Sequence, residues 1–298
     1  MLCLGALSNS KTINVDSNRY SRIVLDKDKQ RVYFSLLDKK PVVASIPMNN
    51  INSNGNTNLR IEATLPNGYS NLIWRNPATG DFLVGDNSLK PDGHRSARVL
   101  YPTGTLGKIV NTNHLNTAYQ NYFGVANAGS FTYDNSNGQI YMCSVYERGV
   151  FSLSSILMTP INGGLSATGT CEQVKKINNA FYFLEFAING TQSSIFSNAT
   201  APLYSHFSSS PIVVSDTTIK DFDVSSTHIY YSNSFTNKIY EVPLYGGNAI
   251  SSRRKILDFM PDSFGYHNGY IYFSNGFSIS RISIAPNSQP EVLYFEAL

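Results

Sequence analysis

The chain has 298 residues, of which 42% are apolar and 14% charged, and its formal net charge is +3. The apolar fraction excludes a disordered chain, and the weak charge excludes the basic stripe of a nucleic-acid-binding protein. No apolar run reaches the ~18 residues that a membrane-spanning helix needs, so no membrane span is predicted.

Residues 1–18 differ from the repeats that follow them. Met1–Ser10 begins with apolar residues, and Ala6-Leu7-Ser8 has the small-x-small pattern of a signal-peptide cleavage site, although no basic residue precedes it. Thr12–Val15 has strand character. We therefore predict that residues 1–18 are either a closing strand or the remnant of a signal peptide, and that residues 19–298 form one domain.

A β-rich tetrapeptide recurs six times, with a mean spacing of about 48 residues. Its second residue is Tyr in every copy but one, which has Leu83. The copies are Val32–Ser35, Phe82–Gly85, Ile140–Cys143, Phe181–Leu184, Ile229–Ser232 and Ile271–Ser274. This spacing is typical of β-propeller blades, and helical periodicity is nowhere sustained.

Strand-like segments surround the tetrapeptides. One precedes them, as in Ser21–Asp26, and a third with alternating polarity follows, as in Lys238–Leu244. The candidate fourth strands are Leu59–Leu65, Arg254–Phe259 and Glu291–Phe295. Four antiparallel strands in each of six units predict an all-β fold, a six-bladed β-propeller. Separate small sheets are the alternative, but each would leave a hydrophobic face uncovered.

Closure and packing of this ring give two further expectations. Because the first and last blades of a propeller must be joined, we expect Thr12–Val15 to pack beside the final blade. In blade five, Ile229, Tyr231 and Ile239 should be covered by neighbouring blades.

The Asn-rich run Asn49–Asn58 is predicted to be a mobile loop that reflects composition rather than function.

The candidate binding residues lie in loops. Asp86–Arg95 mixes both charges, and Tyr146 stands beside Glu147 and Arg148 after another tetrapeptide. A solvated connection and a surface ion pair are the simpler interpretations of these loops. The functional interpretation is a binding face formed by the loops after each second strand and between blades, with the opposite side closed by tight turns of little chemistry. Its predicted contacts are Tyr69, Asp86, His94, Arg95, Tyr146, Glu147, Arg148 and His267.

The three cysteines do not make a disulfide framework or a zinc site. Cys143 and Cys171 could form one bridge if they lie on neighbouring strands in an oxidising compartment, or they could be two free thiols packed as small hydrophobes. Two glycosylation sequons, Asn189-Gly190-Thr191 and Asn198-Ala199-Thr200, are no more than such a composition yields by chance. Together these features favour secretion.

The segment Thr227–Gly247 resembles a blade of the YWTD and TolB-like six-bladed propellers, with its aromatic second strand, its Asn-Lys turn and its closing Gly. That resemblance implies the fold, which hosts receptors, scaffolds and hydrolases. Gly80–Asp86 looks like a blade of the gluconolactonase and strictosidine-synthase-like members. The resemblance implies that a lactonase would hold a divalent cation at the channel. At the comparable positions this chain has Ser21, Ser70 and Asp262, with Asn71 beside the second, and Asp221 and Asp223 lie out of register.

We therefore expect an extracellular binding module rather than an enzyme, with a protein or carbohydrate ligand. No cofactor, catalytic residue or metal ligand is predicted. A metal-dependent lactonase-like hydrolase and a structural surface or matrix protein are the alternatives.

Overall fold

The computed structural model describes residues 12–14, 23–37, 41–51, 58–67, 69–86, 97–109, 128–144, 149–153, 160–163, 169–177, 179–187, 192–198, 212–244, 250–275 and 278–295. Within these ranges the only helical element is a single 3₁₀ turn, η3 (Ile250–Ser252). No helix in the described part of the chain is long and apolar enough to cross a membrane.

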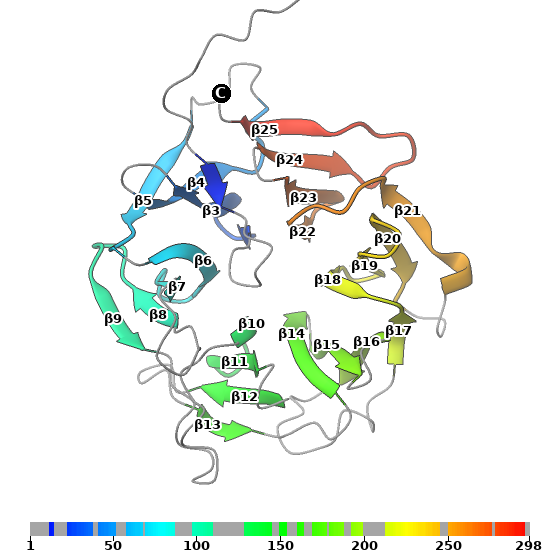
Figure 1. The fold of residues 1–298 in the computed structure, drawn as a ribbon, viewed down its shortest axis with the longest axis horizontal. Helices are drawn as coiled ribbons and strands as arrows, with labels where there is room; N and C mark the ends of the chain where they lie inside the picture. Colours follow the sequence, from blue (N-terminus) through cyan, green and yellow to red (C-terminus); the bar gives the residue numbers. More distant parts are fainter. Residues whose placement is uncertain are drawn as a thin grey trace, which may run out of the picture.

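Six antiparallel sheets surround a common centre, with the first strand of each innermost and the fourth at the rim (Figure 1). Blades one and two contain β1 (Thr12–Asn14), β2 (Val24–Asp26), β3 (Arg31–Leu37), β4 (Val42–Pro47), β5 (Arg60–Thr64), β6 (Tyr69–Arg75), β7 (Phe82–Asp86), β8 (Ala97–Leu100) and β9 (Leu106–Ile109). Blades three and four contain β10 (Ala128–Asp134), β11 (Gln139–Ser144), β12 (Gly149–Leu153), β13 (Pro160–Gly163), β14 (Gly169–Ile177), β15 (Ala180–Ala187), β16 (Ser193–Asn198) and β17 (Ile212–Asp216). Blades five and six contain β18 (Ile219–Val224), β19 (His228–Asn233), β20 (Lys238–Pro243), β21 (Arg254–Leu257), β22 (Ser263–His267), β23 (Tyr270–Ser274), β24 (Ser278–Ser283) and β25 (Glu291–Phe295). The predicted six-bladed propeller is confirmed.

The six tetrapeptides all lie in second strands, and their composition follows from the packing of the blades. Successive side chains of a strand point to opposite faces, so one residue meets the next blade and its neighbour meets the previous one. In blade five, Tyr230 packs with residues of blade six, whereas Ile229 and Tyr231 pack with residues of blade four. Ile239 is fully buried against blade six, as expected. Each of the six blade interfaces contains one such apolar cluster.

The turn between the first two strands of blade six shows why Asn and Gly lie between strands. Asn268 and Gly269 have φ angles of 46° and 80°. A two-residue hairpin turn needs this left-handed region at both positions, which Asn tolerates and Gly adopts without strain. The turn therefore reverses the chain within two residues.

The prediction for the ring closure is wrong. Thr12–Asn14 does not pair with the final blade: β1 pairs with the end of β3, beside β2, so that these two short segments share the inner edge of blade one. The sheet of blade six contains only β22–β25. Without β1, the inner edge of β3 beyond β2 would leave backbone N–H and C=O groups unpaired. Pairing with β1 satisfies them, which explains why β1 joins blade one.

Side chains close the seam between blades six and one. The amide Nδ2 of Asn50 donates to the Leu293 carbonyl at 2.9 Å, and Arg281 donates to the Met48 carbonyl at 3.1 Å. An apolar cluster that includes Phe34 and Tyr294 fills the space between them. Asn50 is 4% exposed and accepts a bond from Asn58, so the two ends of the Asn-rich run are structural, contrary to the expectation of a mobile loop, and residues 52–57 lie outside the described residues.

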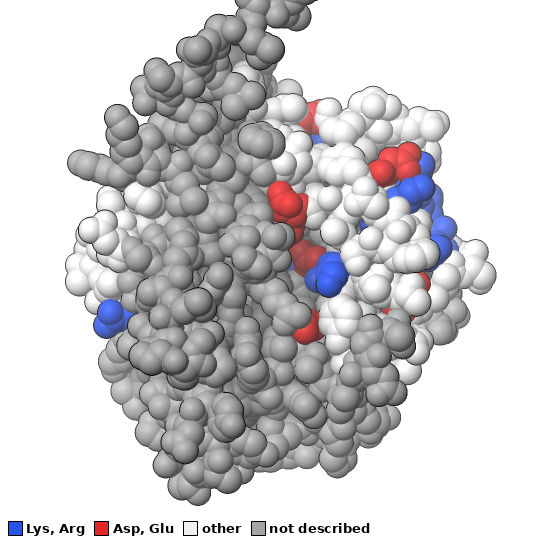
Figure 2. Space-filling view, viewed as in Figure 1, with Lys and Arg blue, Asp and Glu red and all other residues white. Residues whose placement is uncertain are grey.

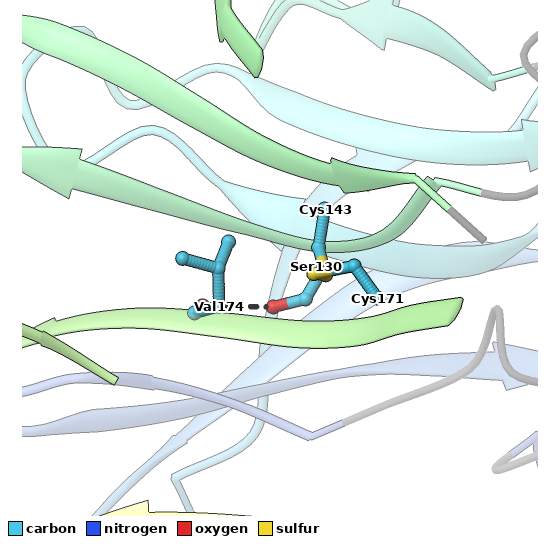
Figure 3. Close-up of a disulfide and its surroundings, with 4 residues drawn as sticks. All are labelled: Ser130, Cys143, Cys171 and Val174. Atoms are coloured by element: carbon cyan, nitrogen blue, oxygen red, sulfur yellow. Dashed lines mark hydrogen bonds between the residues drawn. A yellow bond between two sulfur atoms is a disulfide. The ribbon is translucent and has the colours of Figure 1, made fainter. Parts of the chain in front are cut away.

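Blades three and four are joined covalently. Cys143 of β11 and Cys171 of β14 form a disulfide, with a Cα–Cα distance of 5.5 Å, and both are fully buried (Figure 3). Beside it, the Ser130 hydroxyl donates to the Val174 carbonyl at 3.1 Å. The sequence left two alternatives open, a disulfide or two free thiols, and the structure has the disulfide.

Candidate functional site: the central channel

A cavity of about 360 Å³ occupies the centre of the propeller. Its wall includes residues from the innermost strands of all six blades, and it reaches the exposed turn residues Lys27, Asp28, Pro77 and Asn135. These turns link the first strand of a blade to the second. The cavity therefore opens on the face that carries those links, which we name the turn face; the opposite face, with the links from second to third strands and between blades, is the loop face.

The strand register puts a polar residue at the same level of the channel in every blade. The fourth residue of each tetrapeptide has as its partner on the innermost strand one of Asn14, Asn71, Ser130, Gln173, Asp221 and Ser263. We call these six residues the polar ring. A second level, opposite the second tetrapeptide residue, includes Thr132, Lys175, Asp223 and Gly265.

Side chains at both levels bond to the backbone of the next blade. Gln173 accepts from the Phe222 N–H at 3.1 Å and Asp221 from the Phe264 N–H at 3.5 Å. Because an innermost strand has a partner strand on one side only, its other edge needs such acceptors.

The second level repeats this arrangement with shorter bonds. Thr132 accepts from the Lys176 N–H at 2.8 Å, and Asp223 accepts from the Tyr266 N–H at 2.7 Å. From blade three to blade six, the polar wall of the channel therefore holds neighbouring blades together.

Asp223 is a buried carboxylate of the wall with partners in both neighbouring blades. Burial alone would raise its pKa, but the positive charges of Lys175 and Lys27 and the N–H groups of Tyr266 and Val224 lower the pKa below the ordinary value. Lys175 Nζ lies 3.2 Å from Asp223 Oδ1 and crosses from blade four to blade five. The carboxylate is therefore ionised and fully engaged at neutral pH.

Two other ion pairs near the turn face connect blades. Arg75 of blade two pairs with Asp26 of blade one, and both side chains are buried. Lys176 Nζ of blade four lies 3.2 Å from Asp134 Oδ2 of blade three. Burial works to raise the pKa of Asp134, but hydrogen bonds from Ser136 and the Lys176 charge lower it overall.

Most predicted contact residues lie outside the described residues. These are His94, Arg95, Tyr146, Glu147 and Arg148. For Tyr69 and Asp86 the structure describes the backbone, where the two residues are paired across β6 and β7 at the loop face. The prediction that these loops form one binding surface stays a prediction.

The placement of His267 with that group is wrong. His267 ends the first strand of blade six, and antiparallel strands alternate in direction, so it lies on the turn face. There its Nε2 lies 2.8 Å from Gln30 Nε2 of blade one. Burial and the neighbouring Lys27 charge lower the pKa of His267, while Asp223 and Asp28 oppose this. On the turn face Lys27, Asp28 and Asn135 line the mouth of the channel. The expectation that this face has little chemistry stays a prediction.

Charged side chains on the described surface in view lie in two main groups, one near the axis and one at the rim beside β21. Figure 2 shows acidic and basic side chains around the middle of the face in view, beside the innermost strands of blades four to six in Figure 1, whereas much of the described surface around them is uncharged. Among the residues that the structure describes, no group of three or more His, Cys, Asp or Glu side chains could hold a metal ion.

The polar ring has a signal in the sequence. Every residue of the polar ring precedes a tetrapeptide and faces its fourth position in the strand register. Asp221 and Asp223, which looked out of register with a lactonase site, are in register with this ring and its second level.

The sequence matches no family model and no curated protein. Solved structures share the fold at low identity. A nidogen/laminin complex contains a chain with a TM-score of 0.54 and 11% identity, covering 81% of this chain and 80% of that one. A gluconolactonase from Xanthomonas campestris has a TM-score of 0.52 and 12% identity, covering 98% and 89%. A 6-phosphogluconolactonase candidate from Bacteroides uniformis has a TM-score of 0.54 and 12% identity, covering 93% and 86%. These likenesses show the propeller fold alone.

Proposed function

We propose that the protein is a non-catalytic binding module of an oxidising, extracellular setting, which recognises a protein or glycan through its loop face. The observation that carries this proposal is the use of the channel carboxylates. Asp221 and Asp223 accept bonds from the backbone of blade six, so the acidic groups at the axis hold the propeller together. A lactonase-like site would instead need carboxylate oxygens free to bind a cation.

The disulfide supports the proposed setting. Bridges such as Cys143–Cys171 form and persist in secreted proteins and are rare where thiols are kept reduced. The nidogen/laminin likeness is consistent with a binding role, and the two lactonase likenesses keep the hydrolase as the second candidate.

Phe235 offers a described anchor on the loop face. Its side chain is 82% exposed at the turn between β19 and β20. Its N–H donates to Asn233 Oδ1 at 2.9 Å and to Thr218 Oγ1 at 3.1 Å, so the backbone that carries the ring is already ordered. An exposed aromatic on a rigid turn binds a partner at little entropic cost.

Binding by variant proteins tests this proposal. The purified protein would be applied to a glycan array and to an array of purified extracellular proteins, and the binder found would be titrated against Tyr146→Ala, Arg148→Ala, His94→Ala and Phe235→Ala. We expect each contact variant to weaken binding by about fivefold or more, with a nearly unchanged melting temperature. Tyr101→Ala is the matched control, because Tyr101 is an exposed aromatic on the link between β8 and β9, at the turn face.

Two results would overturn the proposal. One is unchanged affinity in all four contact variants. The other is stoichiometric divalent metal in the purified protein together with lactone hydrolysis, which would establish the hydrolase. A protein that binds neither array and holds no metal would favour the structural surface protein.

A further inference from the structure

The seam between blades six and one has a glycine where two other blade interfaces have a side-chain acceptor. At the second level of the channel, Asp223 accepts a bond from blade six and Thr132 accepts one from blade four. The corresponding residue of blade six is Gly265, which lies against Leu25 of blade one. Because glycine has no side chain, the turn-face corner of the seam has to be joined by another polar contact.

His267 supplies that contact. It lies two residues after Gly265 on β22, so its side chain projects from the same side of the strand. Its Nε2 lies 2.8 Å from Nε2 of Gln30, on the turn between β2 and β3. The two side chains therefore connect blade six to blade one beside the mouth of the channel.

A second bond fixes the orientation of the Gln30 amide. The same Nε2 donates to the carbonyl oxygen of Lys27. If the amide were turned over, its oxygen would face that carbonyl, and two acceptors would meet. Because an amide nitrogen only donates, Nε2 of His267 accepts, and the imidazole proton resides on Nδ1. The contact therefore requires a neutral imidazole.

Backbone bonds connect this contact to the outer part of the seam. The Met48 N–H donates to the Gln30 carbonyl at 2.8 Å, and the Met48 carbonyl accepts from Arg281 Nη1 of blade six at 3.1 Å. Arg281 Nε in turn donates to Glu291 Oε2 at 2.7 Å. Two turns of blade one are thus held between His267 and Arg281 of blade six.

Charged groups from two other elements face His267. Lys27 and Asp28 belong to the turn between β2 and β3, and Asp223 belongs to β18 of blade five. Within blade six, its titratable neighbour is Tyr270, the partner across β22 and β23. Burial lowers the pKa of His267 most, the Lys27 charge lowers it further, and Asp223 and Asp28 oppose both. The imidazole is therefore neutral at neutral pH and becomes charged in mild acid.

We propose that this corner of the seam is a pH-sensitive clasp, closed by the His267–Gln30 bond at neutral pH and opened when His267 is protonated. A charged imidazole has a proton on both nitrogens, so its Nε2 would face the Gln30 amide as a second donor. Rotation of the amide would restore that bond only by turning its oxygen toward the Lys27 carbonyl. In either orientation, acid removes one of the two bonds that hold the Gln30 side chain.

The direction of the pH dependence follows from linkage. Because the pKa of His267 is lower in the folded protein than in the unfolded chain, the unfolded chain binds the proton more tightly. The stabilisation from the clasp is therefore present above the unfolded pKa, about 6.5, and is lost as the pH falls toward the folded value. Asp223 has a pKa below the ordinary carboxyl value, so its own contribution is lost only in stronger acid.

Ring NMR and hydrogen exchange test the clasp. With labelled histidine at about pH 7.5, we expect the His267 proton on Nδ1, with the signals assigned by their loss in His267→Gln. Between about pH 7.5 and pH 5, the protection factor of the Met48 amide should fall about fivefold, the effect of one hydrogen bond. The Leu244 amide is the internal control, because it makes the equivalent bond to the Thr227 carbonyl in blade five at 2.8 Å.

Two variants should remove the acid response by different routes. His267→Gln keeps a side-chain acceptor but cannot become charged, so the protection factor of Met48 should no longer depend on pH. Gln30→Glu places a carboxylate beside the imidazole, which should raise the pKa of His267 and keep the clasp closed at about pH 5. His228→Gln is the matched control, because His228 begins β19 at the turn face of blade five, and it should respond to acid as the parent does.

Three results would each overturn the proposal: a His267 proton on Nε2 at neutral pH, parallel losses of protection at Met48 and Leu244, or an unchanged acid response in His267→Gln. The clasp does not depend on the proposed function. Its readouts need no ligand, so the seam and the loop face can fail separately.

Discussion

Two parts of the channel wall differ in how their polar residues are used. Between blades three and six, Thr132, Gln173, Asp221 and Asp223 bond to the backbone of the following blade. At the corner between blades six and one, Gly265 leaves room for Leu25, and Ser263 Oγ has no partner among the described residues. An added Cβ at Gly265 would lie 2.8 Å from Leu25 Cδ1.

This difference teaches that a polar channel is not by itself a functional site. Carboxylates that satisfy the inner edges of strands are part of the structure, and only groups outside that network are free to meet a ligand. The polar side chains between blades three and six therefore explain how neighbouring blades are held together.

The largest expected effect is on the free energy of unfolding. It compares the apolar packing between blades five and six with that between blades six and one. Ile239 of β20 packs between blades five and six, and Ile279 occupies the equivalent position of β24 between blades six and one. Both side chains are fully buried, so Ile239→Ala and Ile279→Ala should each lower the free energy of unfolding by about 2 to 5 kcal/mol. Urea unfolding measures this. A loss below about 1 kcal/mol for Ile239→Ala would mean that it is not part of the core, and a small loss for Ile279→Ala alone would mean that the seam is not closed by apolar packing.

The disulfide gives the next effect. Cys143 and Cys171 are 28 residues apart in sequence, so their bridge restricts the unfolded chain. The double variant Cys143→Ala/Cys171→Ala should lose about 3 kcal/mol of unfolding free energy, in the range typical of such loops. The single variant Cys3→Ala is the control and should have no effect on the bridge. Equal stability of the parent protein with and without reductant would contradict the prediction.

Asp223 gives a smaller effect with a defined pH dependence. Asp223→Ala removes two bonds between blades, at a cost of about 2 to 3 kcal/mol at neutral pH. Because its pKa is lower in the folded protein than in the unfolded chain, this stabilisation is present above the ordinary carboxyl pKa and is lost as the pH falls through the folded value. Unfolding between neutral and acidic pH should therefore be less pH-dependent in Asp223→Asn than in the parent. Parallel pH profiles would contradict the assignment, and the exposed Asp28→Asn serves as the control.

The repeated tetrapeptide was sufficient to predict the architecture. A side chain such as Tyr230 or Tyr231 has to be covered on whichever face it points to, and the regular spacing requires that neighbouring sheets do the covering. The closure could not be predicted in the same way, since a three-residue segment such as Thr12–Asn14 carries no information about which free strand edge it will meet.

The candidate site was less accessible to sequence analysis. The face of His267 required the direction of its strand, and the role of Asp223 required the identity of its neighbour in the ring, Tyr266, which is 43 residues away. The loop residues His94, Tyr146 and Arg148 remain predictions, because they lie outside the described residues.

Hydrogen exchange at the inner edges of the blades tests the central claim most directly. The N–H groups of Lys176, Phe222 and Tyr266 donate to side chains of the preceding blade. We predict that these amides are protected as strongly as amides within the sheets, and that Asp223→Ala releases Tyr266 while Lys176 and Phe222 stay protected. Exchange of all three in the parent protein at the rate of exposed turn amides would contradict the claim that the channel side chains hold the blades together.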